Sequence, residues 1–444
     1  MNTEQNILLA FYGDDLTGST DALEFICRAG AHAVLFLEPP SLAHLHNYPG
    51  LQAYGVAGLT RSLSPEMMEK VLTPSLKTMK ESGARHIHYK VCSTFDSSPH
   101  TGSIGRAIDC GAAIFQHPFV PVLGGMPALG RYCVFGNLFA RMGTSSSGNI
   151  YRLDRHPSMS RHPVTPAHES DLRIHLGNQT KRKIGLIDVI QIEKDIAQWH
   201  KAIKHDDEVV LLDALEEAQL LKIGAWLDAQ CKNGEPLYSV GSSGIEMALG
   251  QQWNKMGMLQ PTQSWRKLDK AEPLLVVSGS CSPVTKNQIA YALANGFAEV
   301  PVVADCSRGG ADDAIVFCFD LKKLTSCLTD KQSVIVHTGN LGDVPHSALS
   351  ESLGPALGSI ASNAIRAHKL KRVVIAGGDT SSEVGRVLDI EALEMIAPLV
   401  AGAPVCKAHS SDQAIDGMEI NFKGGQVGSE DYFVILRDGN KKTK

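Results

Sequence analysis

Short apolar runs rich in β-branched residues recur along the chain, and segments with a helical repeat separate them. Glycine or polar turn residues bound each run, which is typical of a buried strand. The runs that we predict as strands are Ile7–Tyr12, Ala33–Leu37, Ala53–Leu59, His86–Val91, Ile184–Ile190, Val209–Leu212, Leu274–Ser278, Val300–Ala304, Ala314–Phe319, Val334–Thr338 and Val373–Ala376. The predicted helices include Ser19–Arg28, Pro65–Glu81, Glu216–Gln230, Thr285–Ala294 and His346–His368. Because strands alternate with helices, we expect an α/β fold with mostly parallel sheets flanked by helices.

The last part of the chain follows a different pattern. Three apolar runs, Ala403–Ala408, Glu419–Phe422 and Tyr432–Leu436, are joined by short links. Short links join antiparallel strands, whereas parallel strands need a long crossover. We therefore predict three strands here and an antiparallel edge to the sheet.

The chain is long enough for two or three domains, with 444 residues. Between Gly250 and Pro273 the sequence loses any clean period, and this stretch is the best candidate for a linker. Trp253 and Trp265 within it indicate that it packs against a surface. We expect two α/β domains, residues 1–255 and 256–444, with an active-site cleft between them.

Composition and charge narrow the classes of partner. The formal net charge of −5 is spread along the chain, and the basic clusters are limited to Lys181–Lys183 and Lys441–Lys444. Nucleic-acid binding needs a basic surface that neutralises phosphates, so nucleic acid is not an expected partner. No apolar stretch approaches the roughly 20 residues of a membrane-spanning helix, so a membrane is not expected either.

The cysteines indicate a reducing compartment. Ten cysteines are scattered without a Cys-x-x-Cys pair, and some, such as Cys318, lie in apolar runs where a thiol acts as a small hydrophobe. The first residues lack the basic region of a signal peptide. We therefore expect a cytoplasmic protein. A zinc site is not expected, because neither a Cys/His quartet nor a His-Glu-x-x-His motif is present.

Two adjacent carboxylates follow the first predicted strand. Asp14 and Asp15 stand in Gly13-Asp-Asp-Leu-Thr-Gly18, directly before a predicted helix. Open α/β sheets bind ligands outside the carboxyl ends of their strands, and a carboxylate there can accept the proton of an attacking hydroxyl. An aspartate before a helix is also a common N-cap. On this pattern alone the pair fits capping as well as catalysis.

A second polar cluster follows the fourth predicted strand. Lys90 precedes Cys92, Ser93 and Thr94, and such a lysine can hold a carboxylate or phosphate as a compact point charge. Turn hydroxyls and backbone N–H groups can bind the same anion. A plain turn rich in serine and threonine would give the same pattern. Arg61, just past another predicted strand, is a candidate for a second anion clamp.

Three glycine-rich loops lie in the second half. Leu274–Pro283 and Val373–Ser382 each run from a strand through small residues into a helix, so their backbone N–H groups can approach a phosphate. Neither contains the P-loop motif or the dinucleotide fingerprint. Two such loops in one domain predict a nucleotide site. The third loop, Asn421–Gly428, is consistent with a nucleotide cover and with a plain hairpin carrying a β-bulge.

Together these blocks resemble the four-carbon acid sugar kinase family. The matching stretches occur in family order and span nearly the whole chain: Gly13–Gly18, Lys90–Asp96, Ser278–Ser282 with Thr285 and Gln288, Gly377–Ser381 and Lys423–Gly428. The resemblance implies an N-terminal domain that binds a sugar acid and a C-terminal domain that binds ATP. It also implies Mg²⁺ on the phosphates, transfer of the γ-phosphoryl group to a terminal hydroxyl, and a possible homodimer.

The resemblance also assigns residues by position. Asp15, followed by Asp14, is the expected general base, and capping of the first helix would fall to Thr17 or Ser19. The residues expected to bind the substrate are Asp14, Arg61, Lys90, Cys92, Ser93 and Thr94. The residues expected to bind the nucleotide are Ser278, Gly279, Ser280, Gly377, Gly378, Asp379, Thr380, Gly424 and Gly425.

One block departs from the threonate and erythronate kinase pattern Lys-x-Asp-Ser-Thr-x-Arg-Gly. Cys92 replaces the aspartate, and Phe95-Asp96-Ser97 stands where Arg-Gly is expected. The Cys-Ser-Thr-Phe-Asp form is similar to the branch that acts on 3-oxo acids such as 3-oxo-tetronate. The block Phe115–Gly143 is more similar to relatives that act on 3-oxo-isoapionate. We expect an ATP-dependent kinase of one of these acids.

Three alternatives stay open on the sequence. A threonate or erythronate kinase would share the same loops. A non-catalytic sugar-acid sensor would keep the fold without turnover. A dehydrogenase or epimerase acting on the same acids would use a dinucleotide, and the fingerprint for one is absent from the strand ends.

Overall fold

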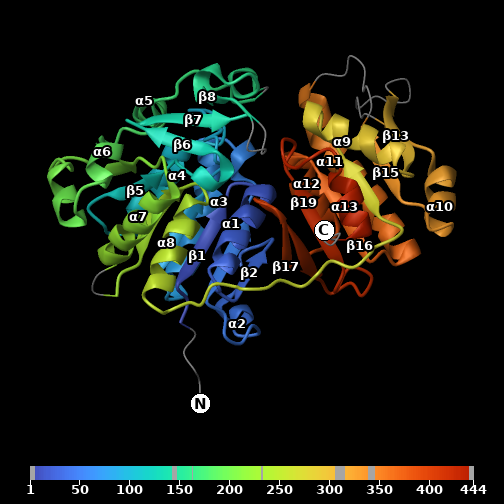
Figure 1. The fold of residues 1–444 in the computed structure, drawn as a ribbon, viewed down its shortest axis with the longest axis horizontal. Helices are drawn as coiled ribbons and strands as arrows, with labels where there is room; N and C mark the ends of the chain where they lie inside the picture. The colour runs from blue at the N-terminus through green and yellow to red at the C-terminus, as the bar shows by residue number, and fades with distance from the viewer. Residues whose placement is uncertain are drawn as a thin grey trace. The chain divides into compact units, whose positions relative to one another are not determined.

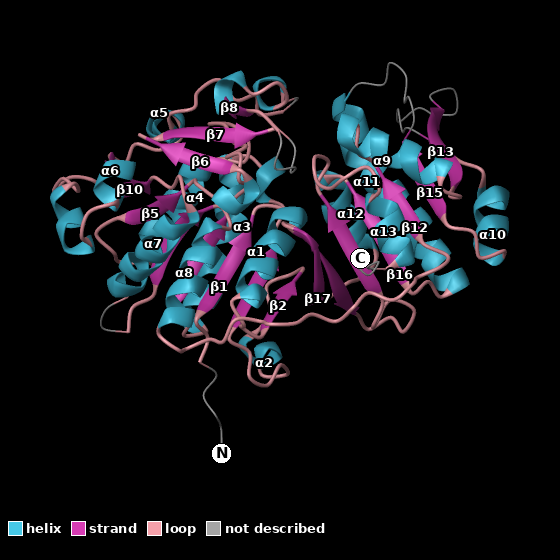
Figure 2. Ribbon diagram, in the orientation of Figure 1, coloured by secondary structure: helices cyan, strands magenta, loops and turns pink. Residues whose placement is uncertain are grey.

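The fold divides into two compact units, Met1–Gln263 and Ser264–Lys444. The computed structural model describes residues 6–142, 148–162, 164–231, 234–305, 316–338 and 346–439. Figures 1 and 2 show both units as α/β structures in which helices flank a sheet, as the sequence predicted. The predicted division after residue 255 coincides with the end of a helix, Gly244–Lys255.

The first unit is built on a parallel sheet with the strand order β2-β3-β1-β4-β11-β5-β10-β9. Every neighbouring pair in it is parallel. The strands are β1 (Leu9–Gly13), β2 (Ala33–Phe36), β3 (Ala53–Ala57), β4 (His86–Lys90), β5 (Val120–Leu123), β9 (Ile184–Ile187), β10 (Val209–Leu212) and β11 (Leu237–Gly241). Parallel strands are covered on both faces, which explains why they read as continuous apolar runs.

Helices flank this sheet. They are α1 (Leu16–Arg28), α2 (Leu42–Leu45), α3 (Pro65–Glu81), α4 (Ile104–Ile114), α5 (Leu172–Gly177), α6 (Val189–Ile192), α7 (Glu217–Gln230) and α8 (Gly244–Lys255). The predicted helix at Pro65–Glu81 is confirmed with the same bounds. Ser64 caps it by accepting a hydrogen bond from the Met67 amide at 3.4 Å, and Pro65 occupies its first position.

A small antiparallel sheet that the sequence did not predict lies within the block Phe115–Gly143 and just beyond it (Figure 1). Its strands are β6 (Arg131–Val134), β7 (Asn137–Arg141) and β8 (Ile150–Arg152). It is tied to the chain just past β10, because Cys133 and Ala214 exchange backbone hydrogen bonds of 2.9 and 3.0 Å. The small sheet therefore lies at the carboxyl edge of the large one.

The second unit has the strand order β14-β13-β15-β12-β16-β19-β18-β17. Its centre is parallel and both edges are antiparallel. The strands are β12 (Leu275–Ser278), β13 (Ala298–Asp305), β14 (Val316–Cys318), β15 (Val334–Thr338), β16 (Arg372–Ala376), β17 (Ala392–Val400), β18 (Ala403–His409) and β19 (Glu419–Lys423). The helices are α9 (Pro283–Ala294), α10 (Leu321–Thr329), α11 (His346–His368), α12 (Gly378–Val387) and α13 (Tyr432–Asp438).

The antiparallel edge predicted near the C-terminus is confirmed, but the strand predicted at Tyr432–Leu436 is wrong. This segment forms α13, and its buried residues Tyr432, Phe433 and Leu436 pack into the core beside Val276 and Val374. An apolar run this short shows no period that separates a strand from a helix. Its side chains reach the core because they share one face of a helix.

Two other predicted strands need adjustment. The strand predicted at Ile184–Ile190 ends at Ile187, because Asp188 caps a short helix with a capping box. Of the strand predicted at Ala314–Phe319, the first two residues lie outside the described residues, and the rest contains β14. The linker predicted between Gly250 and Pro273 starts too early, because α8 continues to Lys255 and contains the fully buried Trp253. Trp265 does pack, against the core of the second unit.

Among the residues that the structure describes, no helix is both long and apolar enough to cross a membrane.

Candidate active site

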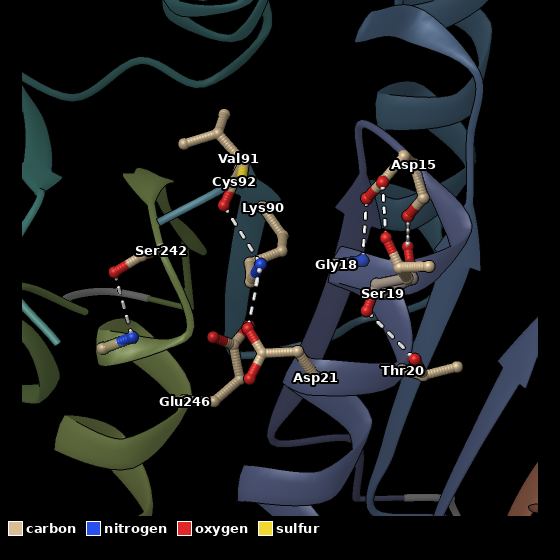
Figure 3. A network of polar contacts seen from close by, with 12 residues as sticks. Asp15, Gly18, Ser19, Thr20, Asp21, Lys90, Val91, Cys92, Ser242 and Glu246 are labelled. Carbon is tan, nitrogen blue, oxygen red and sulfur yellow. Dashed lines mark hydrogen bonds and ion pairs between the residues drawn. The ribbon is translucent and has the colours of Figure 1, made fainter. Parts of the chain in front are cut away.

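The two aspartates lie where β1 ends and α1 begins, and Figure 3 shows Asp15 beside the first turn of this helix. Asp15 caps α1: its backbone is extended, and its Oδ1 accepts a hydrogen bond from the Gly18 amide at 2.7 Å. Its Oδ2 accepts from the Thr17 hydroxyl at 2.7 Å, and the Ser19 hydroxyl donates to the Asp15 carbonyl at 2.6 Å. The prediction that Thr17 or Ser19 caps this helix is wrong, because Asp15 itself occupies the N-cap position.

Arg61 joins the two carboxylates. It lies in a short 3-10 helix, η1 (Thr60–Ser62), which follows β3. Its Nε and Nη2 contact Oδ2 and Oδ1 of Asp14 at 3.2 and 3.0 Å, and its Nη1 lies 2.8 Å from Asp15 Oδ2. Burial raises the pKa of Asp14; Arg61 opposes this rise and the like charge of Asp15 adds to it. Arg61 is thus fully engaged by the two aspartates.

Lys90 is the last residue of β4 and is fully buried. Its ammonium donates to the Val91 carbonyl at 3.0 Å and pairs with Asp21 Oδ2 of α1 at 3.3 Å (Figure 3). Burial lowers the pKa of Lys90, but the charges of Asp21 and Asp14 outweigh this effect and the pKa is raised. The helix can approach this closely because Gly18 has no side chain: a Cβ there would lie 3.2 Å from Lys90 Nζ.

The turn after β4 places a thiol and a hydroxyl beside the aspartates. The Cys92 amide donates to Asp14 Oδ2 at 3.4 Å, and Cys92 Sγ lies 3.1 Å from Thr94 Oγ1, which donates to Asp96 Oδ2 at 2.9 Å. Burial raises the pKa of the Cys92 thiol to about 11, so the thiol is neutral near pH 7. The side chain of Phe95 is buried and anchors the turn. Its φ of 54° lies in the left-handed region, which is uncommon for a residue other than glycine.

The residues predicted for the acid site therefore lie together at one sheet edge. They are Asp14, Asp15, Arg61, Lys90, Cys92 and Thr94. Ser93 lies in the same turn and is partly exposed. Arg61 and Lys90 are both ion-paired with carboxylates of the first unit, so neither predicted cation keeps an unpaired charge for a substrate carboxylate.

Sequence reasoning missed a buried layer beneath these residues. Asp21 of α1 and Glu246 of α8 approach Lys90 from two helices (Figure 3), and both are buried. Glu246 Oε1 lies 2.5 Å from Nδ1 of His88, the buried histidine two residues before Lys90. Acidic residues are rarely buried without a partner. An acid among the apolar residues of the predicted helix Ser19–Arg28 was the signal that could have found Asp21, whereas the helix that carries Glu246 was not predicted.

In the second unit, the three glycine-rich loops leave the sheet side by side. β12, β16 and β19 are neighbours, and their last residues, Ser278, Ala376 and Lys423, are in register. The first loop continues into α9, which Ser282 caps by accepting a hydrogen bond from the Thr285 amide at 3.1 Å. Loops that start at one edge in register can act on one ligand.

The loops pack so closely that they need glycine. A Cβ on Gly279 would lie 2.3 Å from Thr380 Oγ1, and one on Gly425 would lie 2.9 Å from Ser280 Oγ. Gly377, directly before α12, has a φ of 124°, which residues with a side chain rarely adopt. The residues predicted for the nucleotide site lie in these three loops: Ser278, Gly279, Ser280, Gly377, Gly378, Asp379, Thr380, Gly424 and Gly425. Within the first of these loops, Cys281 is exposed.

Helix α9 holds the third loop in place. Thr285 Oγ1 donates to the Gly425 carbonyl at 3.0 Å, and Gln288 Nε2 donates to the carbonyls of Val427 and Ser429 at 2.9 and 3.0 Å. These two α9 side chains therefore act on the loop backbone, which leaves the loop amides available to a ligand.

Sequence reasoning gave no role to Lys423, although this lysine is the first residue of the matching stretch Lys423–Gly428. Lys423 is fully buried, and its ammonium donates to Thr285 Oγ1 at 2.9 Å and to the Gly424 carbonyl at 3.0 Å. The Nζ atom lies 5.8 Å from the ring centroid of Tyr432. No described carboxylate pairs with it, and burial lowers the pKa of Lys423 to about 7. It is a buried cation directly below loops of a phosphate-binding type.

Paired carboxylates at the sheet edge of one unit and interlocked phosphate-type loops in the other define a two-domain phosphotransferase. Residues 9–249 match the sugar-binding N-terminal domain family, and residues 275–433 match the nucleotide-binding C-terminal domain family. The chain belongs to the four-carbon acid sugar kinase family, as its motifs predicted.

Three known proteins show how similar the chain is to characterised and solved relatives. A 3-oxo-isoapionate kinase of Paraburkholderia graminis is 42% identical, over 98% of this chain and 94% of that protein. A 3-oxo-tetronate kinase of Pseudomonas savastanoi pv. phaseolicola is 26% identical, over 96% of each. A solved protein of Salmonella typhimurium LT2, described as a tRNA synthase, has a TM-score of 0.72 at 22% identity, over 96% of this chain and 98% of that one. At that identity the likeness shows the fold alone.

Proposed function

We propose that this protein transfers the γ-phosphoryl group of ATP to a terminal hydroxyl of 3-oxo-isoapionate, with 3-oxo-tetronate as the second candidate. The identity of 42% to a 3-oxo-isoapionate kinase over almost the whole chain, against 26% to a 3-oxo-tetronate kinase, carries this order. Cys92, where the threonate and erythronate pattern has an aspartate, supports a 3-oxo acid over those two substrates.

The Asp14–Asp15 pair is our candidate for the base that accepts the hydroxyl proton. The sequence favours Asp15, which lies at the start of α1 with both carboxylate oxygens engaged. The raised pKa of Asp14 gives this carboxylate a higher proton affinity than an ordinary aspartate has, and its Oδ2 faces the Cys92 turn. Asp14 is therefore an equally strong candidate for the same step.

Mg²⁺ is the metal that we propose to accompany ATP. Proteins commonly hold Mg²⁺ with one or two carboxylates together with phosphate oxygens of the substrate. Asp379 fits this role, since it is the one carboxylate in the three glycine-rich loops. The described residues contain no group of three or more His, Cys, Asp or Glu side chains that could hold a metal ion. When bound, Mg²⁺ would neutralise charge on the phosphates.

The partners and the compartment follow the same reasoning. We propose that the sugar acid and ATP are the partners, and that the protein works in the cytoplasm. Every cysteine that the structure describes is a free thiol, which supports a reducing compartment. The homodimer stays a prediction from the sequence.

The test is an ADP-release assay over 3-oxo-isoapionate, 3-oxo-tetronate, threonate and erythronate. We expect the highest kcat/KM with 3-oxo-isoapionate and a product that carries phosphate on a terminal carbon, as shown by ³¹P NMR. Turnover of threonate or erythronate alone would refute the 3-oxo assignment. ATP binding without turnover of any acid would favour the sensor.

A further inference from the structure

The acid site contains a third cation whose position differs from that of the other two. Arg131, the first residue of β6, pairs with Met126 in the loop after β5: the Arg131 amide donates to the Met126 carbonyl at 3.1 Å, and the Met126 amide donates back at 2.8 Å. This loop leaves the same sheet edge as Lys90, because β5 and β4 both neighbour β11 and all three are parallel. A Cβ on Gly124 of the loop would lie 3.5 Å from the Phe95 ring.

The guanidinium of Arg131 lies within range of the charges of the acid site. Burial lowers the pKa of Arg131, and Cys92, Asp96 and Asp21 act on it in the opposite direction. Asp96 closes the turn that carries Cys92, and Asp21 is the partner of Lys90. Arg131 therefore reaches the acid site from the small sheet, on the side of the turn.

One nitrogen of this guanidinium is fixed by backbone, and the other two have no hydrogen-bond partner among the described residues. Nη1 donates to the carbonyls of Leu129, Arg141 and Gly130 at 2.9, 3.2 and 3.4 Å. Nε is buried without a hydrogen-bond partner, and Nη2 has no partner among the described residues. No described carboxylate forms an ion pair with Arg131. Arg131 is only partly exposed, and a cation with little contact to water and no counter-ion is costly, so an anion at this edge would stabilise it.

The unpaired Nε–Nη2 edge of Arg131 is the edge with which other arginines of this chain bind carboxylates. Arg61 holds Asp14 with its Nε and Nη2, and Arg85 holds Asp228 with the same two atoms at 2.9 and 3.1 Å. The planar fork of arginine matches a carboxylate in this bidentate geometry. The partner that best fits the unpaired edge of Arg131 is therefore a carboxylate.

We propose that the Nε–Nη2 edge of Arg131 binds the carboxylate of the sugar acid. The inference rests on the proposed function and names the residue that recognises the acid group. It also gives a reason for the altered turn, where Phe95-Asp96-Ser97 stands in place of Arg-Gly. In this chain the guanidinium comes from β6, within the block Phe115–Gly143, which is more similar to the 3-oxo-isoapionate relatives.

The test compares wild type with Arg131→Gln on two substrates, the most active acid of the panel and its neutral carboxamide. For the variant we expect the KM of the acid to rise about 100-fold, as for the loss of a charge-assisted bidentate contact, with the KM of ATP unchanged. We expect wild type to have a higher kcat/KM for the acid than for the carboxamide, and Arg131→Gln to lose this preference. Arg131→Lys keeps the charge without the fork, so it falls between the two.

The matched control is Arg106→Gln, which removes a surface arginine of α4 that pairs with Glu69. We expect it to leave every kinetic constant unchanged. A thermal shift with Mg-ATP equal to that of wild type shows that each variant is folded. If Arg131→Gln fails this check, the acid preference of Arg131→Lys decides.

The outcomes separate the two proposals. If wild type turns over no acid, the proposed function fails. If wild type is active and Arg131→Gln keeps both its KM for the acid and its preference over the carboxamide, the role of Arg131 is refuted. If only kcat falls and the preference for the acid is intact, Arg131 would act on the transferred phosphoryl group. That outcome would also refute the proposal that Arg131 binds the carboxylate.

Discussion

Asp15 serves both the first helix and the acid site. Its carboxylate caps α1 through the Gly18 amide and also pairs with Arg61. Asparagine caps a helix about as well as aspartate does. An Asp15→Asn change therefore removes the negative charge and the basicity while the acceptor oxygen of the cap stays. The same exchange at Asp14 removes a base without shortening the side chain.

If one of these aspartates accepts the hydroxyl proton, we expect its change to asparagine to lower kcat by about 10²- to 10⁴-fold. Steady-state kinetics of Asp14→Asn and Asp15→Asn measure this. The control is Asp320→Asn, because Asp320 also caps a helix, α10 of the second unit, by accepting a hydrogen bond from the Lys323 amide at 2.9 Å. It should keep full activity. Full turnover of both site variants would remove the base from this pair.

We expect Lys423 to make ATP binding depend on pH. Its pKa of about 7 means that the ligand-free protein loses this charge as the pH rises through 7. Phosphates beside the loop favour the charged form, so binding takes up a proton. The affinity for Mg-ATP should then fall roughly tenfold per pH unit above pH 7 as long as the bound lysine stays protonated. Calorimetric titration from pH 7 to 9 measures this, and Lys423→Met should flatten the profile.

The stability of the ligand-free protein should change in the opposite direction. Burial lowers the pKa of Lys423 from its ordinary 10.5, so between about pH 7 and 10.5 the unfolded chain holds a proton that the folded chain has lost. The contribution of this lysine to the free energy of unfolding therefore increases with pH in that window. The contribution of Lys423 is measured by comparing the free energies of unfolding of wild type and Lys423→Met across this pH range. An ATP affinity with the same pH profile in both proteins would contradict the assignment.

Among the elements, the three glycine-rich loops form one interlocked structure. A Cβ on Gly279 would lie 2.3 Å from Thr380 Oγ1, so Gly279→Ala has to push the first loop away from α12. We expect the KM for ATP to rise at least tenfold, because displaced amides lose contact with phosphate oxygens. Gly177→Ala is the control, because nothing lies within 4 Å of its Cβ position and its φ is not positive. An unchanged KM for ATP in Gly279→Ala would place the nucleotide elsewhere.

The elements also show what could be predicted from the sequence. Strands β1, β4, β12 and β16 were predictable because parallel strands form continuous apolar runs that end at glycine or polar residues. Helix α13 was not, because its five apolar residues gain their direction only from packing on the core. The small sheet β6–β8 was missed because its strands are short and only partly buried, so they carry no strong pattern.

Some residues of the candidate site could likewise be predicted from the sequence, and others could not. Asp14, Lys90 and Gly377 were predicted as site residues because each stands at a strand end, where α/β proteins bind ligands. Asp21 and Arg131 were not, because neither stands at the end of a strand of the large sheets and both reach the site through tertiary contacts. The order of residues along the chain does not indicate such tertiary contacts. Likewise, only the structure shows that Asp14 and Asp15 both form ion pairs with Arg61 and so neutralise its charge.

For the whole molecule, the two-unit organisation predicts that each ligand protects its own unit. In hydrogen exchange followed by mass spectrometry, Mg-ADP should slow exchange in residues 278–288, 376–382 and 423–429 of the second unit. The sugar acid should slow exchange in residues 13–21, 60–63, 90–97 and 124–131 of the first. Bound ligand lowers the population of locally open states, which is what the method detects. Protection of the second unit alone by the sugar acid would contradict the assignment of the acid site.

Cys281 gives the nucleotide loop a chemical handle. It is exposed between two serines of the first glycine-rich loop, whereas the other described cysteines are buried or partly buried. A small alkylating reagent will therefore modify this thiol first among them, and a fluorophore attached there would sit beside the phosphates of a bound nucleotide. Occupancy of the loop could then be followed optically in real time, without a coupled enzyme and before any sugar acid is added.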